Sequence, residues 1–511
     1  MFRAFSFAFL LLALAGCEPA APPAASTPGR VFILGFDGLT PDLVERLEAE
    51  GVLPNFARLR EEGAVGTVRS TIPMISPPAW TTVATGVPPE AHGVWSFWIP
   101  EDGDPRGRFV DATSRLAPPI WEELSARERS VAVVNVPITS PPDPVNGVMV
   151  AGFPYPEGDP LTYPPELEAE LTEAGYRRDE WPGPPAAGEE LDWLREAQAI
   201  GNSRREVMLP RLLEGDYDFT MIVFTLPDRI SHHLWKFHEE ANPRYRADAP
   251  DEVKSAVRDV YVWCDEILGE VRAKLKSDTN LFVVSDHGFN SANFGLSKAH
   301  VFEGFANTVS SAAADAPAES RNLFGGDFWL GTEDEATRAA FVAHLQGLRD
   351  RQGRSVVHRV HDLRKGPEIG HGRELGPHVV AEEADGYLFV PGRPGDPLVV
   401  PLGEQVFSGW HRRGGYFGAA GYSVQAGPVR DFDLRDIAAM SLHLLGEKIP
   451  RHYVHNMPKR LFPNLFFVER PMIFDGAPDA GYYRPGERET RELDPSVVEQ
   501  LESVGYTGGG S

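Results

Sequence analysis

Short apolar runs alternate with amphipathic segments along most of the chain. The runs 31–36, 221–227 and 281–285 are rich in Val, Ile, Leu and Phe and lie between segments with helical periodicity. Such runs are typical of strands that are buried on both faces of a parallel sheet. Further strand candidates are 64–69, 131–136 and 148–152. The alternation predicts an α/β fold with a largely parallel sheet.

Helix-start signals follow several of these runs. Thr40 and Pro41 form a typical cap and first helical position, and Pro54 opens a second helix. The adjacent prolines Pro77 and Pro78 predict a further helix with Ser76 at its N-terminus. Apolar residues at helical spacing predict long helices over 189–213 and 251–275.

Two stretches interrupt this pattern. Residues 155–190 are rich in Pro, Gly and Glu and poorly periodic, and residues 290–405 are of mixed type, so both are interpreted as insertions. We therefore predict one main domain over 31–470, followed by a C-terminal tail over 471–511.

The N-terminus has the pattern of a lipoprotein signal. A short positive segment and an apolar stretch lead to Leu-Ala-Gly-Cys ending at Cys17, which resembles a bacterial lipobox. Residues 1–17 are thus predicted to be a signal peptide with lipid attachment at Cys17, and residues 18–30 an extended Pro/Ala-rich tether. By resemblance to Gram-negative lipoprotein sorting rules, Glu18 after the cysteine favours the outer membrane, facing the periplasm. An ordinary signal peptide is the alternative.

Composition narrows the classes of partner. The net charge of -25 argues against a nucleic-acid scaffold, although it permits a small phosphorylated substrate where bound metals reverse the local sign. The chain has two cysteines, and Cys264 lies in the apolar stripe of a predicted helix. With Cys17 lipidated, no internal disulfide forms, and Cys264 is expected in the core.

Three strand candidates each lead to an aspartate: Asp37, Asp228 and Asp286. His232 follows Asp228 by four residues, one helical turn, and His287 directly follows Asp286. Ligands of open α/β sheets bind beyond the carboxyl ends of the strands, so these side chains are expected to gather at one edge. Mixed carboxylate and imidazole ligands favour zinc or manganese.

A set of ordered motifs carries a resemblance to a known family. The motifs are Asp37-Gly38, Ser76-Pro-Pro-Ala-Trp-Thr-Thr-Val-Ala-Thr-Gly86, Pro89-Glu-Ala-His-Gly93, Pro227-Asp-Arg-Ile-Ser-His232, Ser285-Asp-His-Gly288 and Gly409-Trp-His411. Together they resemble the alkaline phosphatase superfamily, closest to type I phosphodiesterases/nucleotide pyrophosphatases and bacterial phosphohydrolase relatives. The resemblance runs from about residue 30 to about residue 425 and implies a three-layer α/β/α sandwich with insertions.

The resemblance also implies roles for individual residues. Ser76 matches the nucleophile, which forms a phosphoseryl intermediate. Two divalent metal ions, zinc first and manganese as the alternative, would be held by Asp37, Ser76, Asp286 and His287 at one site and by Asp228, His232 and His411 at the other. His411 is assigned through the resemblance alone. The implied activity is hydrolysis of phosphoric esters, of the phosphodiesterase or nucleotide pyrophosphatase kind.

The match has departures, which leave alternatives open. Pro77 and Ala79 stand where nucleotide pyrophosphatases carry a base-stacking aromatic residue and an asparagine, which weakens a nucleotide assignment. Trp80 is interpreted as core packing or as a wall of the substrate pocket. The alternative functions are a phosphomonoesterase, a phosphomutase or phosphoryl transferase, and a catalytically silent metal-binding envelope lipoprotein.

Overall fold

The computed structural model describes residues 28–503, with gaps at 102–103, 308–317, 320–323, 367, 431, 454–456, 465, 477–481 and 484–494. The predicted signal peptide 1–17 with Cys17, most of the tether and much of the 471–511 tail lie outside the described residues. Among the described residues, no helix combines the length and the apolar composition that a bilayer crossing requires.

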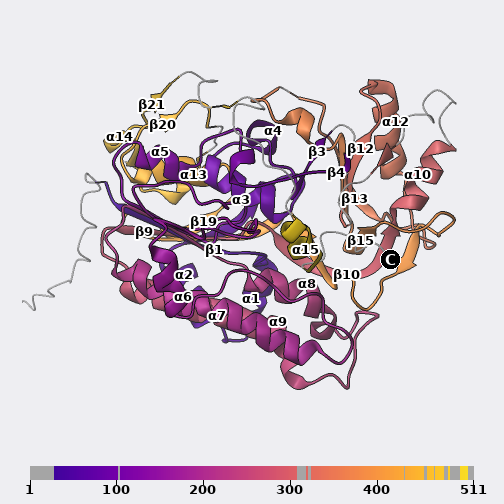
Figure 1. Ribbon diagram of the computed structural model, residues 1–511, viewed down its shortest axis with the longest axis horizontal. Helices are drawn as coiled ribbons and strands as arrows, with labels where there is room; N and C mark the ends of the chain where they lie inside the picture. Colours follow the sequence, from indigo (N-terminus) through magenta and orange to yellow (C-terminus); the bar gives the residue numbers. More distant parts are fainter. Residues whose placement is uncertain are drawn as a thin grey trace, which may run out of the picture.

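A nine-stranded sheet is the largest in the described part of the chain (Figure 1). Its strands, in spatial order, are β19 (Gly427–Val429), β2 (Ala64–Arg69), β18 (Gly414–Gly421), β9 (Thr279–Val284), β1 (Arg30–Phe36), β8 (Phe219–Phe224), β5 (Val131–Val134), β6 (Gly147–Val150) and β7 (Thr162–Tyr163). Neighbours pair in parallel except at β18, which is antiparallel to β2 and β9, and at β7. The prediction of a largely parallel sheet is therefore confirmed.

Helices cover both faces of this sheet (Figure 1). On one face, Phe32, Leu34 and Phe36 of β1 join a core that is completed by one group of helices, whereas Val31 and Ile33 join a second core on the other face. The first group is α1 (Pro41–Ala49), α2 (Pro54–Glu62), α7 (Glu190–Glu214), α8 (Leu226–His238) and α9 (Asp251–Lys274); the second is α3 (Ser76–Thr85), α5 (Ile120–Ser125) and α13 (Asp436–Leu444). The three-layer sandwich is thus present.

Most helix and strand positions agree with the apolar pattern, with one instructive exception. The run 221–227 was expected to be a strand throughout, but β8 ends at Phe224 and α8 begins at Leu226. Pro227 lies in the first helical turn, where its missing N–H costs nothing. Asp228 is consequently in the first turn of a helix. Cys264 lies on α9 and is fully buried in the core, as expected.

The stretch 290–405 contributes further sheets, with a core of their own. One sheet consists of β10 (Gly288–Ser297), β15 (Gly386–Val390), β16 (Val399–Pro401) and β17 (Gly409–Arg412), and another of β11 (Ala318–Glu319), β12 (Asp327–Leu330), β13 (Val357–Asp362) and β14 (Val379–Glu383), beside α10 (Lys298–Ala306) and α12 (Glu335–Gln346). Other described elements are α4 (Pro89–His92), β3 (Trp98–Glu101), β4 (Asp104–Phe109), α6 (Leu167–Glu173), β20 (Ile449–Pro450), α14 (Phe466–Glu469), β21 (Phe474–Asp475) and α15 (Pro495–Ser503).

Candidate active site

The three strand-end aspartates lie at one edge of the central sheet. β1 is flanked by β8 and β9, and all three run parallel, with Phe36 opposite Phe224 and Gly35 opposite Val284. Asp37 directly follows β1, Asp286 follows β9 by two residues, and Asp228 lies in the first turn after β8. Because the registers match, the three carboxylates come together beyond the same strand ends, where ligands of open α/β sheets bind.

The turn after Asp37 depends on a glycine. Gly38 has a φ of +75°, in the left-handed region, and a β-carbon there would lie 2.5 Å from Cε2 of Phe289. A larger residue would therefore be strained and would also clash. The glycine lets the chain turn at once into α1 while Asp37 stays pointed at the site.

The histidines reach the edge from three different elements. His232 lies one turn after Asp228 on α8, and His287 lies between β9 and β10. β17 pairs antiparallel with β10, with His411 opposite Phe289. This pairing brings a residue far along the chain next to the strand-end carboxylates.

One group of possible ligands is formed by Asp228, His232 and His411, all buried. Oδ1 of Asp228 lies 3.3 Å from Nε2 of His232 and 3.3 Å from Nε2 of His411. The two Nε2 atoms are 2.9 Å apart. These atoms converge closely enough to share one ion.

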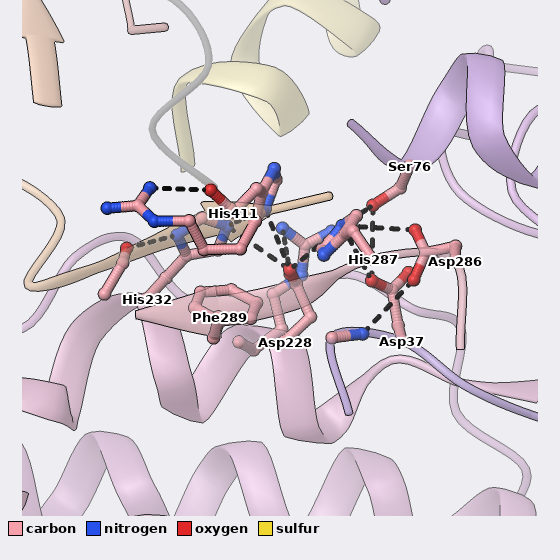
Figure 2. Close-up of polar contacts among 12 residues, drawn as sticks. Asp37, Ser76, Asp228, His232, Asp286, His287, Phe289 and His411 are labelled. Carbon is pink, nitrogen blue, oxygen red and sulfur yellow. Dashed lines mark hydrogen bonds and ion pairs between the residues drawn. The ribbon is translucent and has the colours of Figure 1, made fainter. Parts of the chain in front are cut away.

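The second group surrounds Ser76. Its hydroxyl oxygen lies 3.3 Å from Oδ1 of Asp37 and 3.3 Å from Nε2 of His287. Nε2 of His287 is in turn 3.1 Å from Oδ2 of Asp286. Figure 2 shows Ser76, Asp37 and Asp286 gathered around His287.

Asp228 lies between the two groups (Figure 2). Its Oδ1 is 4.0 Å from Nε2 of His287, and Asp37, Asp228 and His287 also offer converging ligand atoms. The structure thus brings together all seven residues that the sequence singled out for the metal sites. It places Asp228 within reach of both groups, whereas the resemblance had linked it to one.

Burial of three carboxylates in one place has electrostatic consequences. Burial, together with the charges of neighbouring carboxylates, holds the pKa of Asp37 and of Asp286 well above the usual value. Burial also raises the pKa of Asp228, but contacts with His232 and His411 outweigh it and hold that pKa well below the usual value. Burial lowers the pKa of His411 to about 4 and that of His287 well below its usual value. Neutral imidazoles facing crowded carboxylates are suited to bind cations.

These residues fit divalent metal ions. Oδ2 of Asp286 is buried and accepts no hydrogen bond among the described residues, although Nε2 of His287 lies 3.1 Å away. A buried carboxylate oxygen without a donor is costly, and a cation between Asp286 and its neighbours would remove that cost. Three carboxylates and three imidazoles form a donor set typical of zinc or manganese.

Neighbouring groups fix the orientation of the candidate ligands. Nδ1 of His232 donates to the carbonyl oxygen of Gly409 at 3.1 Å, which leaves Nε2 as the acceptor that faces Asp228. The backbone N–H of Gly38 donates to Oδ1 of Asp286 at 3.2 Å. Such contacts hold a ligand set in place before any ion binds.

Ser76 begins α3, as its two following prolines predict. Pro77 and Pro78 have no N–H, and the N–H of Ala79 donates to the carbonyl of Ile75. The helix start therefore keeps its partial positive charge but offers few free amide donors to a phosphoryl group. Charge at the phosphoryl oxygens has to be balanced mainly by cations.

Two supporting residues were not identified as such from the sequence. Trp80 is fully buried, and its Nε1 donates to Oδ2 of Asp37 at 3.0 Å. Its position four residues after Ser76, on the same face of the helix, was the available signal. The ring of Phe289 packs against His232, His287 and His411, with ring centroids 4.9, 5.6 and 5.1 Å away.

The chain is similar in sequence to a known protein family. The model of the family described as type I phosphodiesterase/nucleotide pyrophosphatase matches residues 31–411. No curated protein sequence gives a significant match.

Solved structures share the fold. Human ectonucleotide pyrophosphatase/phosphodiesterase 5 aligns over 85% of this chain and 100% of its own, with a TM-score of 0.50 and 14% identity. The inactive murine protein in complex with AMP has a TM-score of 0.50 and 16% identity, and it likewise aligns over 85% of this chain and 100% of its own. Phosphonoacetate hydrolase from Sinorhizobium meliloti in complex with phosphonoformate has a TM-score of 0.53 and 16% identity, and it aligns over 82% of this chain and 96% of its own.

Proposed function

The chain belongs to the type I phosphodiesterase/nucleotide pyrophosphatase family, metal-dependent phosphoester hydrolases of the alkaline phosphatase superfamily, and we propose that it cleaves phosphoric diesters through a phosphoseryl intermediate on Ser76. The observation that carries the proposal is the position of the Ser76 hydroxyl, 3.3 Å from both Asp37 and His287. A serine at a helix start, beside a buried set of carboxylates and imidazoles, is arranged for nucleophilic attack.

The proposed cofactors are two divalent metal ions, zinc in the first instance and manganese as the alternative. Asp37, Ser76, Asp286 and His287 would hold one, and Asp228, His232 and His411 the other. Two such ions, when bound, stabilise the attacking and leaving oxygens of an in-line displacement and favour the ionised serine hydroxyl.

The residues of the chain then define the order of steps. Ser76 Oγ loses its proton and attacks phosphorus, a Ser76–O–P bond forms, and the bond from phosphorus to the departing alcohol oxygen breaks as that oxygen takes up a proton. Water next loses a proton and attacks the same phosphorus, the Ser76–O–P bond breaks, Ser76 Oγ regains a proton, and the phosphomonoester product leaves. The buried indole N–H of Trp80 holds the Asp37 carboxylate beside Ser76.

The substrate is proposed to be a small phosphorylated molecule other than a nucleotide. The murine ectonucleotide pyrophosphatase/phosphodiesterase 5, which shares the fold, was solved in complex with AMP. In this chain Pro77 and Ala79 stand one and three residues after Ser76, at the positions where the family's nucleotide pyrophosphatases recognise a base and a phosphate oxygen. Both side chains are apolar and buried, so neither supplies a stacking ring or an amide donor.

The test is a substrate panel with a matched pair of variants. Bis(4-nitrophenyl) phosphate, 4-nitrophenyl phosphate, a 4-nitrophenyl phosphonate and 4-nitrophenyl sulfate are compared on the metal-loaded protein. We expect Ser76→Ala to lower turnover of the diester by at least about 10³-fold, whereas Ser76→Thr keeps a hydroxyl and much of the activity. Undiminished turnover in Ser76→Ala would rule the proposal out, and a strong preference for the monoester would assign a phosphomonoesterase instead.

We also propose that the protein is a lipid-anchored lipoprotein of the Gram-negative envelope, attached through Cys17 and facing the periplasm from the outer membrane. The lipobox-like Leu14-Ala15-Gly16-Cys17 supports this assignment. Labelled palmitate should enter the wild type and the Cys264→Ser control, and should be absent from Cys17→Ser. Equal labelling of Cys17→Ser would contradict it.

A further inference from the structure

A cavity of about 220 Å³ lies beyond the end of β2, lined by none of the seven candidate metal ligands. We call it the Arg413 pocket. Its walls come from residues 69–72 at the end of β2, Thr82 of α3, residues 88–90 around the start of α4, His361 and Leu363 at the end of β13, and residues 433–435, together with Arg413. A cavity of this size holds several water molecules or one end of a small organic ligand.

The Arg413 pocket borders the same sheet edge as the candidate active site. β18 is antiparallel to both β2 and β9, so β2 runs in the direction of β9 and ends at the same edge. The N–H of Ser70 donates to the carbonyl oxygen of Arg413 at 2.8 Å. Arg413 follows His411 by two residues, which span at most about 7 Å of chain, and Ser70 precedes Ser76 on the connecting loop.

Arg69 and Arg413 each lie near one carboxylate, and each of these carboxylates has another partner that is closer. Asp433 accepts two hydrogen bonds from Arg435, at 2.8 and 2.5 Å, and lies 3.9 Å from Arg69. Likewise Glu382 is in close contact with His361 and lies 3.8 Å from Arg413.

The remaining lining carboxylate is Glu90, whose neighbouring positive charges are Arg373 and Arg435. The guanidinium groups of Arg69 and Arg413 are therefore the less neutralised charges of the pocket.

Buried polar atoms of the pocket also have unmet hydrogen-bonding capacity. Ser70 is 4% exposed, and its hydroxyl has no hydrogen-bond partner among the described residues. Nε of Arg413 is buried and likewise has none there. Buried donors in native proteins are nearly always satisfied, so these two donors point to an acceptor that occupies the cavity.

We propose that the Arg413 pocket binds an oxyanion, a carboxylate or a phosphate, at the far end of the substrate and apart from the phosphoryl group that Ser76 attacks. Guanidinium groups form paired, charge-assisted hydrogen bonds to such groups. The proposal rests on the proposed phosphodiesterase function and adds a substrate class to it, namely diesters with a second anionic group.

The test uses 4-nitrophenyl phosphodiesters that differ in the second arm, which is butyl, 3-carboxypropyl or 5-carboxypentyl. In the metal-loaded full chain, kcat/KM should favour a carboxylate arm over butyl by at least about tenfold, through KM. The preference should fall toward unity in Arg413→Gln and in Arg69→Gln. Arg58→Gln, which removes an exposed arginine of α2, is the matched control and should retain it.

The outcomes separate the subsite from the activity. Turnover of the butyl ester without a preference at either arm length would overturn the subsite and leave the phosphodiesterase standing. If no ester is cleaved, calorimetry with glutarate tests the pocket directly, and binding that Arg413→Gln abolishes supports an oxyanion site. Glutarate that binds without competing with the carboxylate-arm ester would identify a free anion as the ligand and overturn the substrate assignment.

Discussion

The indole Nε1 of Trp80 lies 3.0 Å from Oδ2 of Asp37 and donates a hydrogen bond to it. The contact joins the nucleophile helix to the end of the central strand. A β-carbon at Gly35 would come within 2.7 Å of the Trp80 ring, so the helix packs closely on β1. Ser76 and Asp37 are therefore positioned by one rigid contact between two layers of the fold.

Replacing Trp80 by phenylalanine should weaken metal binding. The ring keeps much of its packing, while Asp37 loses the donor that fixes its orientation. Loss of such a supporting hydrogen bond typically lowers metal affinity by about 10–100-fold. Titration of the metal-free protein with zinc, followed by turnover at limiting zinc, measures the effect.

Trp121→Phe is the matched control for Trp80→Phe. Trp121 is also fully buried, and its Nε1 donates to Asp143 at 2.8 Å, away from the candidate ligands. Both variants lose one buried hydrogen bond, so both should be less stable by about 1–3 kcal/mol. Zinc affinity that falls equally in the two variants would show a general effect of stability and contradict the positioning role.

The number of bound metal ions should depend on which ligand is removed. Asp228 Oδ1 lies near His232, His411 and His287, so it contacts both ligand groups. We expect about two ions per chain in the wild type and about one in His411→Ala. Asp228→Asn should retain less metal than His411→Ala. Elemental analysis after dialysis measures this, and a chelator should remove both the metal and the activity.

His411→Ala and Asp228→Asn binding the same amount of metal would contradict the shared position of Asp228. His452→Ala is a suitable control, because His452 is buried but lies outside both ligand groups. It should bind as much metal as the wild type.

The central fold was predictable because strands that are buried on both faces have continuous apolar runs in their own sequence. β1, β8 and β9 each contain a run of buried apolar residues, and the prolines at 41, 54 and 77 indicate helix starts without reference to the rest of the chain. The overextended strand at 221–227 has a local cause as well. Leu226 and Pro227 are apolar, but they belong to the first turn of α8, and apolar character alone does not separate the two states.

The site was only partly predictable from the residues themselves. The strand-end aspartates follow buried runs, so their convergence follows from the parallel sheet. His411 reaches them through the pairing of β17 with β10, which no local pattern encodes, and the family resemblance was needed to identify it. The hydrogen bond of Trp80 to Asp37 depends on how α3 packs on β1, which is a tertiary relationship.

Gly38→Ala should be much more harmful than Gly51→Ala. Both glycines have a positive φ, +75° and +76°, which costs an alanine about 1–2 kcal/mol. At Gly51 nothing lies within 4 Å of an added β-carbon, whereas at Gly38 it would meet Phe289 at 2.5 Å. Urea unfolding should show a larger loss for Gly38→Ala, and turnover should fall in that variant alone. Equal losses would mean that Phe289 moves aside freely.

Glu383, at the end of β14, offers a test of pH-dependent stability away from the candidate ligands. Its side chain is buried, beside Arg412 and Lys298, and one of its oxygens accepts from the N–H of Phe389. Burial raises the pKa of this carboxyl from 4.5 to about 7, more than these neighbours lower it. The folded protein therefore holds this proton to a higher pH than the unfolded chain does.

Stability that depends on Glu383 should consequently be lost as the pH rises. Between the unfolded pKa of 4.5 and the folded pKa of about 7, the native state binds more protons, so the contribution is full below 4.5 and declines through 7. Glu383→Gln removes the titration but keeps the shape. The free energy of unfolding of the wild type, minus that of Glu383→Gln, should fall by about 2–3 kcal/mol from about pH 5 to about pH 8. Urea unfolding at a series of pH values measures this difference, and a constant or rising difference would show that the carboxyl is ionised in the folded protein throughout.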